Sequence, residues 1–193
     1  MLDLERAHPL RYGPQKSEVK SRLDARIHPE LAEAWLQAEA AEGRLFTRGD
    51  RLRRSGADLP LSVEHAALRD RMMQTLRAAG FSGPSQKELL DAFVGERDAV
   101  EMLGLLTAEE SVVRLPGEIL ILSEFLTDAR ARLERYFGER ETMAVADLKG
   151  VLDVSRKQGV PLLEYFDRLG WTARRGDVRI AGSRLNEAGE RPR

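Results

Sequence analysis

SRKQGVPLLEYFDRLGWTARRGDVRI, residues 155–180, has the pattern of one helix followed by one hairpin. Ser155 and Gln158 have the spacing of a helix capping box, Pro161 falls early enough in the helix to be tolerated, and Gly170 suits the position that ends it. Two short β segments then flank an Arg-Gly-Asp turn. The apolar stripe expected to face the core comprises Val160, Leu163, Phe166 (or Leu162) and Leu169.

Two further helices are predicted upstream of this stretch. Residues 123–137 place apolar side chains along one stripe opposite a run of charged ones, as an amphipathic helix does. Thr142 is expected to cap a second, short helix that carries Val145, Leu148 and Val151 or Leu152. Three helices followed by a hairpin are the order of a winged helix.

The chain repeats this order. Residues 43–53 align with residues 170–180, and both segments contain Arg-Gly-Asp. Residues 111–121 have the pattern of a third hairpin without that triplet. We therefore expect a mainly α fold with small β-hairpins (α+β), built as three tandem winged-helix domains at residues 1–60, 61–122 and 123–184, with a polar tail at 185–193.

The other two domains show the same helical signals. In the second, helices are predicted over residues 62–79 and 96–106, with a capping box between Ser85 and Glu88. In the first, helices are predicted over residues 16–23 and 29–42, with Pro29 near the start of the latter. Its first helix is little more than residues 1–8, which indicates that the chain starts inside a domain.

Composition narrows the class of protein. The 193 residues are 42% hydrophobic with a mean hydropathy of -0.41, too apolar for a disordered chain and too polar for a membrane protein. There is no cysteine, which excludes disulfides and thiolate metal sites and fits a cytosolic protein.

Charge is unevenly distributed along the chain. The net charge is -1, which predicts no bulk attraction to nucleic acid. Residues 155–184, however, contain seven basic and three acidic side chains, net +4, which leaves -5 for the rest. This concentration predicts a binding surface for a polyanion.

No motif for catalysis is present. The sequence has neither a phosphate-binding loop nor a His-Glu-x-x-His pair, and nothing pairs a nucleophile with a base. The histidines, His8, His28 and His65, are too far apart in sequence to indicate a metal site. We expect no enzyme activity, no metal and no cofactor in this chain. The two Arg-Gly-Asp triplets are explained as hairpin turns rather than adhesion motifs, because glycine supplies the positive φ and aspartate can bond local backbone.

The predicted anion site lies where the last helix begins. Ser155, Arg156 and Lys157 stand at a helix N-terminus, where free N–H groups and the helix dipole favour a phosphate and disfavour cations. The wing that follows adds a second group of cations. Together they are expected to form a concave basic surface; the wing residues are Arg174, Arg175 and Arg179.

Residues 148–179 resemble the final winged-helix domain of the SelB family of bacterial selenocysteine-specific translation elongation factors. The resemblance is carried by the ordered pattern SRK…PLLEYFDR.G.T.R.GD.R. His8-Pro9-Leu10-Arg11-Tyr12-Gly13, followed by Lys16 and Glu18, resembles the start of an earlier winged helix of that family.

The resemblance implies a function in selenocysteine incorporation. The last domain would bind an mRNA hairpin downstream of a UGA codon, as a monomer in the cytoplasm and without a membrane. The ribosome and selenocysteyl-tRNA would be partners of the full-length factor, and GTP and Mg²⁺ would belong to its GTPase part, absent here. The implied RNA contacts are Ser155, Arg156, Lys157, Arg168, Arg174 and Arg179. Two positions depart from the family pattern: Ala173 replaces an arginine, for which Arg175 can compensate, and Gln158-Gly159 replaces a bulkier pair.

Two other functions fit a winged-helix array. A DNA-binding regulator would insert the last helix into the major groove, but Glu164 and Asp167 on its expected outward face would repel DNA. A protein-interaction array would bind no nucleic acid and would tolerate loss of Arg156.

Overall fold

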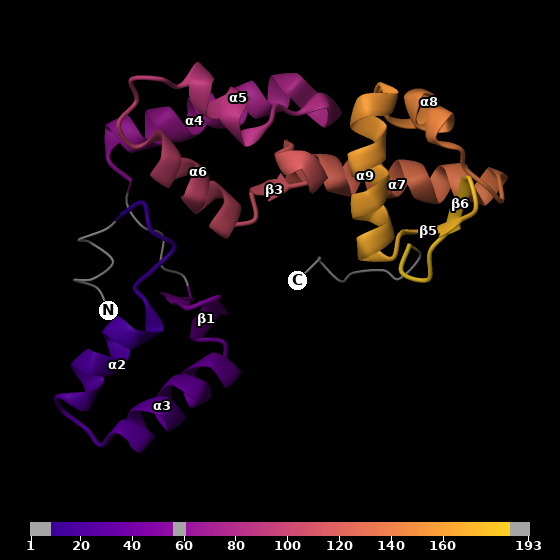
Figure 1. Ribbon diagram of the computed structural model, residues 1–193. Coiled ribbons are helices and arrows are strands. Elements are labelled where there is room, and N and C mark those ends of the chain that lie inside the picture. The colour runs from indigo at the N-terminus through magenta and orange to yellow at the C-terminus, as the bar shows by residue number, and fades with distance from the viewer. Residues whose placement is uncertain (1–8, 56–60, 186–193) are drawn as a thin grey trace. The chain divides into compact units, whose positions relative to one another are not determined.

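The computed structural model describes residues 9–55 and 61–185 (Figure 1). The chain divides into two compact units, Met1–Arg69 with Arg97–Glu109 and Asp70–Glu96 with Glu110–Arg193. The boundary between them crosses a single helix, α4 (Val63–Ala79). Within the described ranges, no helix is both long and apolar enough to traverse a lipid bilayer.

Three antiparallel hairpins succeed one another along the chain, each preceded by helices, and this order confirms the predicted α+β fold of tandem winged-helix domains. The predicted helix at residues 1–8 lies outside the described residues, and the domain boundaries stay a prediction. The elements of the first repeat are α2 (Lys16–Asp24), α3 (Pro29–Ala41), β1 (Leu45–Arg48) and β2 (Arg51–Arg54). The second repeat comprises α4, η1 (Gly80–Ser82), α5 (Gln86–Ala92), α6 (Ala99–Ala108), β3 (Val112–Arg114), η2 (Pro116–Glu118) and β4 (Leu120–Leu122). The third comprises α7 (Ser123–Glu139), η3 (Val145–Asp147), α8 (Leu148–Leu152), α9 (Arg156–Leu169), β5 (Thr172–Arg175) and β6 (Val178–Ala181).

A short backbone bridge recurs in every repeat between the segment before a helix and the second strand of the hairpin or the residue that precedes this strand. In the first two repeats that segment begins with Gly-Pro, and the glycine has no room for a side chain. A Cβ on Gly13 would lie 2.0 Å from the carbonyl oxygen of Leu52, and one on Gly83 would lie 1.8 Å from that of Leu120. The bridged pairs are Gln15 with Arg51, Ser85 with Ile119, and Met143 with Arg179.

The predicted turn and cap residues adopt the expected backbone conformations. Gly49 and Gly176, the glycines of the two Arg-Gly-Asp turns, have φ of 56° and 64°, and Gly170 ends α9 at φ 72°. Residues with a Cβ adopt these angles less readily, so the backbone favours glycine at each position.

Three predicted details differ in the structure. Leu162, Leu163 and Phe166 are buried as predicted, but Val160 is 36% exposed, because Gly159 takes the buried position at that turn of α9. Thr142 does not cap the short helix: η3 begins after Ala144, whose N–H donates to Asp147 Oδ2 at 2.7 Å. The third helix of the second repeat begins at Ala99 rather than Glu96, after Asp98. As predicted, α9 tolerates Pro161 and continues through it, with the loss of one intrahelical hydrogen bond.

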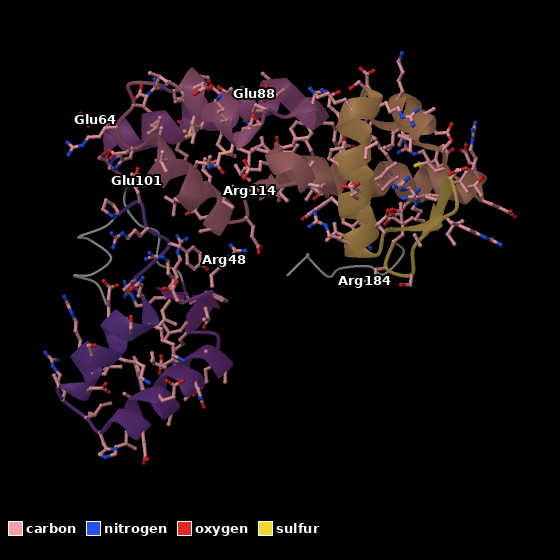
Figure 2. The ribbon with its side chains drawn as sticks, viewed as in Figure 1. Arg48, Glu64, Glu88, Glu101, Arg114 and Arg184 are labelled. Carbon is pink, nitrogen blue, oxygen red and sulfur yellow. The ribbon has the colours of Figure 1, made fainter. Side chains whose placement is uncertain are left out.

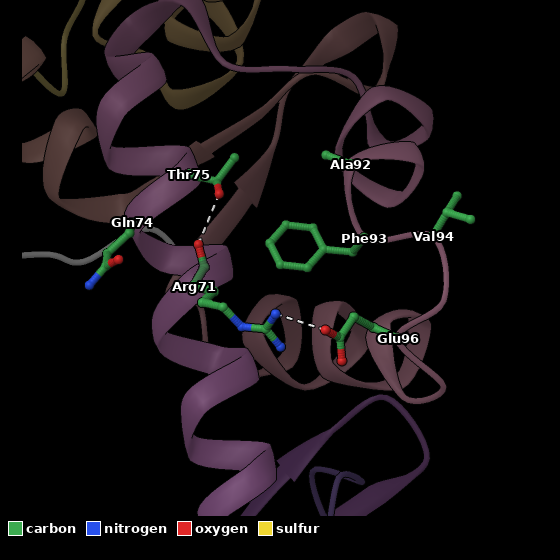
Figure 3. Close-up of a pocket in the computed structure, with 7 residues that line it drawn as sticks. All are labelled: Arg71, Gln74, Thr75, Ala92, Phe93, Val94 and Glu96. Atoms are coloured by element: carbon green, nitrogen blue, oxygen red, sulfur yellow. Dashed lines mark hydrogen bonds and ion pairs between the residues drawn. The ribbon is translucent and has the colours of Figure 1, made fainter.

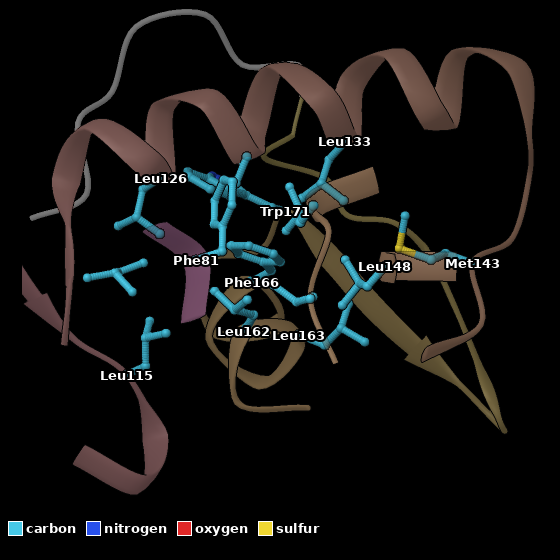
Figure 4. Packing of buried hydrophobic residues seen from close by; sticks show 14 of the residues in the cluster. Phe81, Leu115, Leu126, Leu133, Met143, Leu148, Leu162, Leu163, Phe166 and Trp171 are labelled. Carbon is cyan, nitrogen blue, oxygen red and sulfur yellow. The ribbon is translucent and has the colours of Figure 1, made fainter. Parts of the chain in front are cut away.

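One apolar core in the second unit joins residues of the second and third repeats (Figure 4). Leu133 of α7 and Phe166 of α9 are fully buried at its centre. Trp171 stacks on Phe166 with ring centroids 5.6 Å apart. Phe81 and Leu115 of the second repeat belong to the same cluster. The helix that carries the predicted site is therefore held by contacts from two repeats.

Candidate nucleic-acid interface

The start of α9 is built as predicted. Ser155 is the N-cap, its hydroxyl donates to Gln158 Oε1 at 2.6 Å, and its N–H donates to the same oxygen at 3.0 Å. Arg156 and Lys157 follow as exposed side chains, and neither forms a hydrogen bond or ion pair within residues 9–55 and 61–185. We call Ser155, Arg156 and Lys157 the α9 start.

The α9 start differs in charge from the other capping boxes of the described chain. Those boxes end on an acidic side chain, Glu18, Glu88 or Asp147, which answers the positive end of the helix dipole. In α9 the corresponding residue is the neutral Gln158, and the first turn holds no acid. The positive end of this dipole and two cations therefore face solvent together, an arrangement that favours a bound anion.

The wing, which we define as β5 and β6 with their turn, contributes two exposed cations. Arg174 donates from Nε to the carbonyl oxygen of Gly176 at 3.1 Å, and Arg175 is exposed beside it. The strands pair Arg174 with Arg179 and Arg175 with Val178. Since α9 packs against β5, the wing lies along the C-terminal part of that helix.

Arg179 does not lie on the surface where it was expected. It is only 7% exposed, and its Nε lies 3.3 Å from Asp167 Oδ2 on α9. The other oxygen of Asp167 accepts a hydrogen bond from the hydroxyl of Thr172. Asp167 thus connects both strands of the wing to α9, and Arg179 holds the wing in place beneath the predicted surface.

Asp167 was also expected to face outward and repel DNA. Its carboxylate is instead directed at Arg179 and Thr172, while Glu164 remains exposed. The electrostatic argument against a DNA-binding helix therefore rests on Glu164 alone.

Arg168 occupies the last turn of α9, exposed, with its guanidinium 5.5 Å from the centroid of the Tyr165 ring. It lies about 17 Å along the helix from Lys157, given a rise of about 1.5 Å per residue. The predicted site residues thus form two groups: the α9 start at one end, and Arg168 with Arg174 and Arg175 at the other.

The α9 start has neighbours that the sequence analysis missed. Two hydrogen bonds from Ser85 at the start of α5 lower the pKa of Glu88, and the charge of Lys157 lowers it further. On β3, the exposed Arg114 bonds to Gln86, the residue after Ser85, and Figure 2 shows Glu88 and Arg114 on their two elements. The capping box of Ser85 and Glu88 can be recognised from the sequence, but no local pattern places it beside α9.

A pocket elsewhere in the second unit contains none of the predicted site residues. Its lining includes Arg71, Phe93 and Glu96 (Figure 3). The charges there are already paired, with Arg71 Nη1 2.7 Å from a Glu96 carboxylate oxygen. In the first unit, His65 Nε2 lies 3.1 Å from Asp98 Oδ2. Within the described ranges, no group of three potential metal ligands is present.

Two family models match the chain, both described as elongation factor SelB, winged helix. They cover residues 6–53 and 135–181. A selenocysteine-specific elongation factor of Desulfomicrobium baculatum is 26% identical over 178 residues. That match covers 92% of this chain and 28% of the relative, so the chain spans little more than a quarter of the relative's length.

Two solved structures share the fold. The crystal structure of a bacterial selenocysteine-specific elongation factor, EF-Sec, matches with a TM-score of 0.51 and 22% identity over 93% of this chain and 28% of that one. The mRNA-binding domain of elongation factor SelB from E. coli, solved in complex with SECIS RNA, matches with a TM-score of 0.50 and 21% identity. It covers 64% of this chain and the whole of that domain.

Proposed function

Because the chain is a winged-helix region of the SelB family, we propose that it binds an mRNA hairpin and thereby directs selenocysteine incorporation at UGA. The α9 start carries the proposal, since its exposed cations share a helix N-terminus with no acid in the first turn. The exposed cations of the wing extend this surface, and the RNA contacts are Ser155, Arg156, Lys157, Arg168, Arg174 and Arg175.

The proposed mechanism is recognition of shape and backbone. A-form RNA hides the base edges of its major groove, so a small domain contacts phosphates and the unpaired bases of loops and bulges. Arg156, Lys157 and Arg175 are exposed, and their side chains can change conformation to meet a phosphate. Asp167 and Arg179 act indirectly, by holding the wing beside α9.

In this proposal, nucleotide binding and the interactions with the ribosome and selenocysteyl-tRNA belong to the whole factor. GTP and Mg²⁺ are bound outside this chain, and the chain itself performs no catalytic step. The ribosome and selenocysteyl-tRNA are partners through the complete factor, which acts in the cytoplasm where mRNA is translated.

RNA binding can be tested with the full chain and a synthetic RNA hairpin. Lys157→Ala and Arg174→Ala should each weaken binding without changing helicity, and each should lower the slope of log affinity against log salt by about one. Arg22→Ala, which removes an exposed cation from α2, is the matched control and should leave binding unchanged.

The same binding assay distinguishes hairpin binding from the two alternative functions, a DNA-binding regulator and a protein-interaction array. Duplex DNA that competes as well as the hairpin at equal salt would favour a DNA-binding regulator. Absence of binding to any nucleic acid would favour a protein-interaction array. Unchanged affinity in both Lys157→Ala and Arg174→Ala would remove the proposed surface.

A further inference from the structure

The helix α3 of the first repeat carries large apolar side chains on the side that faces solvent. Its inward side is formed by Ala32 and Leu36, which are buried, and Leu36 belongs to the core of this repeat together with Leu45 of β1. Leu31 and Trp35, by contrast, are 62% and 42% exposed. Because these two residues are four positions apart, their side chains lie next to each other on the helix surface.

Three exposed alanines extend this pair into a stripe along the helix. At about 100° per residue, all five side chains fall within an arc of about 120° around the axis. The first four of them have the i, i+3, i+4, i+7 spacing by which an amphipathic helix binds its partner. We call these five residues the α3 face; they are Leu31, Ala34, Trp35, Ala38 and Ala41.

The α3 face is bordered by acidic side chains. The helix contains three glutamates and no basic residue, and Glu42 follows it as the C-cap. Two lysines of α2 pair with Glu33, whereas Glu39 and Glu42 share the single guanidinium of Arg44. Glu30 is exposed and has no ion-pair partner within residues 9–55 and 61–185. The border of the face therefore keeps an excess of negative charge.

This charge argues against two occupants of the α3 face. Nucleic acid binds helices whose cations meet its phosphates, as Arg156 and Lys157 of α9 do in the proposal above, and α3 has no cation. A second copy of this chain would bring the same glutamates together across a two-fold axis, where they repel. The exposed cations nearest in sequence, Arg22 and Arg26, lie on α2 and in the turn before α3.

We propose that the α3 face binds an amphipathic helix of a protein partner in which lysine or arginine flanks the apolar side chains. Leu31 and Trp35 insert between the apolar side chains of that helix, and the three alanines let its backbone approach closely. The glutamates at the border face its cations. The site lies on the first repeat and does not depend on RNA binding by the third.

The test is a selection from a library of synthetic helical peptides against the full chain. Each peptide has about 18 residues, a length that exceeds the 13 residues of α3, with leucine fixed at i, i+3, i+4 and i+7. The other positions are drawn equally from lysine, glutamate, glutamine and alanine. Peptides with lysine beside the leucines should be enriched. Enrichment of glutamate there, or no enrichment at all, would overturn the proposal.

Variants of the chain then show whether the enriched peptide binds at α3. Its affinity is measured by the fluorescence anisotropy of a labelled peptide. Trp35→Ala should weaken binding by roughly 30-fold, the effect of removing one central aromatic anchor from an interface. Glu30→Gln should weaken binding less and should reduce its dependence on salt, because it removes only a charge at the border. Since Trp35 is half-exposed and alanine favours helix, helicity should be unchanged, and circular dichroism measures it.

Phe46→Ala is the matched control, because Phe46 is an aromatic residue of the same repeat with 51% exposure. Leu45, its neighbour on β1, is buried with Leu36 of α3, and side chains alternate along a strand, so Phe46 points away from that helix. This variant should bind the peptide as tightly as the unmodified chain does.

Three results would contradict a basic helix as the occupant. Equal peptide affinity of Trp35→Ala and the unmodified chain would remove the α3 face as a binding site. A dimer that sedimentation detects and that Trp35→Ala dissociates would assign the face to a second copy. A loss of RNA hairpin binding in Trp35→Ala would assign it to nucleic acid. Peptide binding and hairpin binding are measured separately, so failure of the proposed function leaves this proposal standing, and the reverse also holds.

Discussion

Replacing Asp167 with asparagine tests whether one carboxylate holds the wing on α9. Asp167 bonds to Arg179 of β6 through one oxygen and to Thr172 of β5 through the other. The substitution would keep the size of the side chain and remove its charge. Arg179, whose side chain is 8% exposed, would then remain buried without a counterion.

The loss of stability depends on how deeply the Arg179–Asp167 ion pair is buried. Removing one partner of a fully buried ion pair costs about 3–5 kcal/mol, and the side chain of Asp167 is 25% exposed, so solvent compensates part of the loss. We expect Asp167→Asn to lower the free energy of unfolding by about 2–3 kcal/mol, which lies within the range of about 1.5–3 kcal/mol for a hydrogen bond to a charged group.

Trp171 provides the measurement, because it is 6% exposed and stacks on Phe166 in the same core. The other tryptophan, Trp35, is replaced by phenylalanine, and urea unfolding is followed by fluorescence. Asp177→Asn is the matched control, since Asp177 is exposed at the wing turn and has no side-chain partner in the described chain. Equal unfolding midpoints for the two variants would refute the role given to Asp167.

Two further predictions concern the scaffold. Gly83→Ala should destabilise the chain by about 1–3 kcal/mol, because its Cβ would lie 1.8 Å from the backbone oxygen of Leu120. Gly104→Ala is the matched control, since no atom lies within 4 Å of its Cβ on α6, and it should stabilise the chain by about 0.5–1 kcal/mol. Urea unfolding midpoints that shift in the same direction for both variants would contradict this prediction. Hydrogen bonds from Lys16 and then Lys20 lower the pKa of Glu33 from 4.5 to about 2, so the stability that these contacts contribute should be complete above about pH 4.5 and lost as the pH falls toward 2. NMR titration of the Glu33 carboxyl measures this shift directly, and an ordinary pKa would disprove the contact.

Local signals made the helices and hairpins predictable. The helix of residues 123–137, the boxes at Ser85 and Ser155 and the turn glycines Gly49 and Gly176 were all read from neighbouring residues. A capping box or a positive-φ turn depends on residues a few positions apart, so the sequence contains the needed information. The repeated Gly-Pro pattern at Gly13 and Gly83 was an equally local signal for the second repeat.

The candidate site was only partly predictable, because exposure depends on packing between distant segments. The sequence shows six arginines and one lysine between residues 155 and 184, but their roles differ with what lies opposite each one. Arg174 and Arg179 are cross-strand partners with the same chemistry, yet only Arg179 meets a carboxylate. Val160 is exposed for a similar reason, since the phase of the buried stripe is set by contacts of α9 with other elements.

The amino-acid order alone therefore determined the tandem winged-helix plan and the concentration of cations in the last repeat. Both depend on periodicity, caps and turns, which act over a few residues. Tertiary structure decided that Arg179 and Asp167 are internal, and that Lys157 lies close enough to Glu88 to lower its pKa. Desolvation and charge pairing are set by side chains that folding brings together, and no local pattern encodes them.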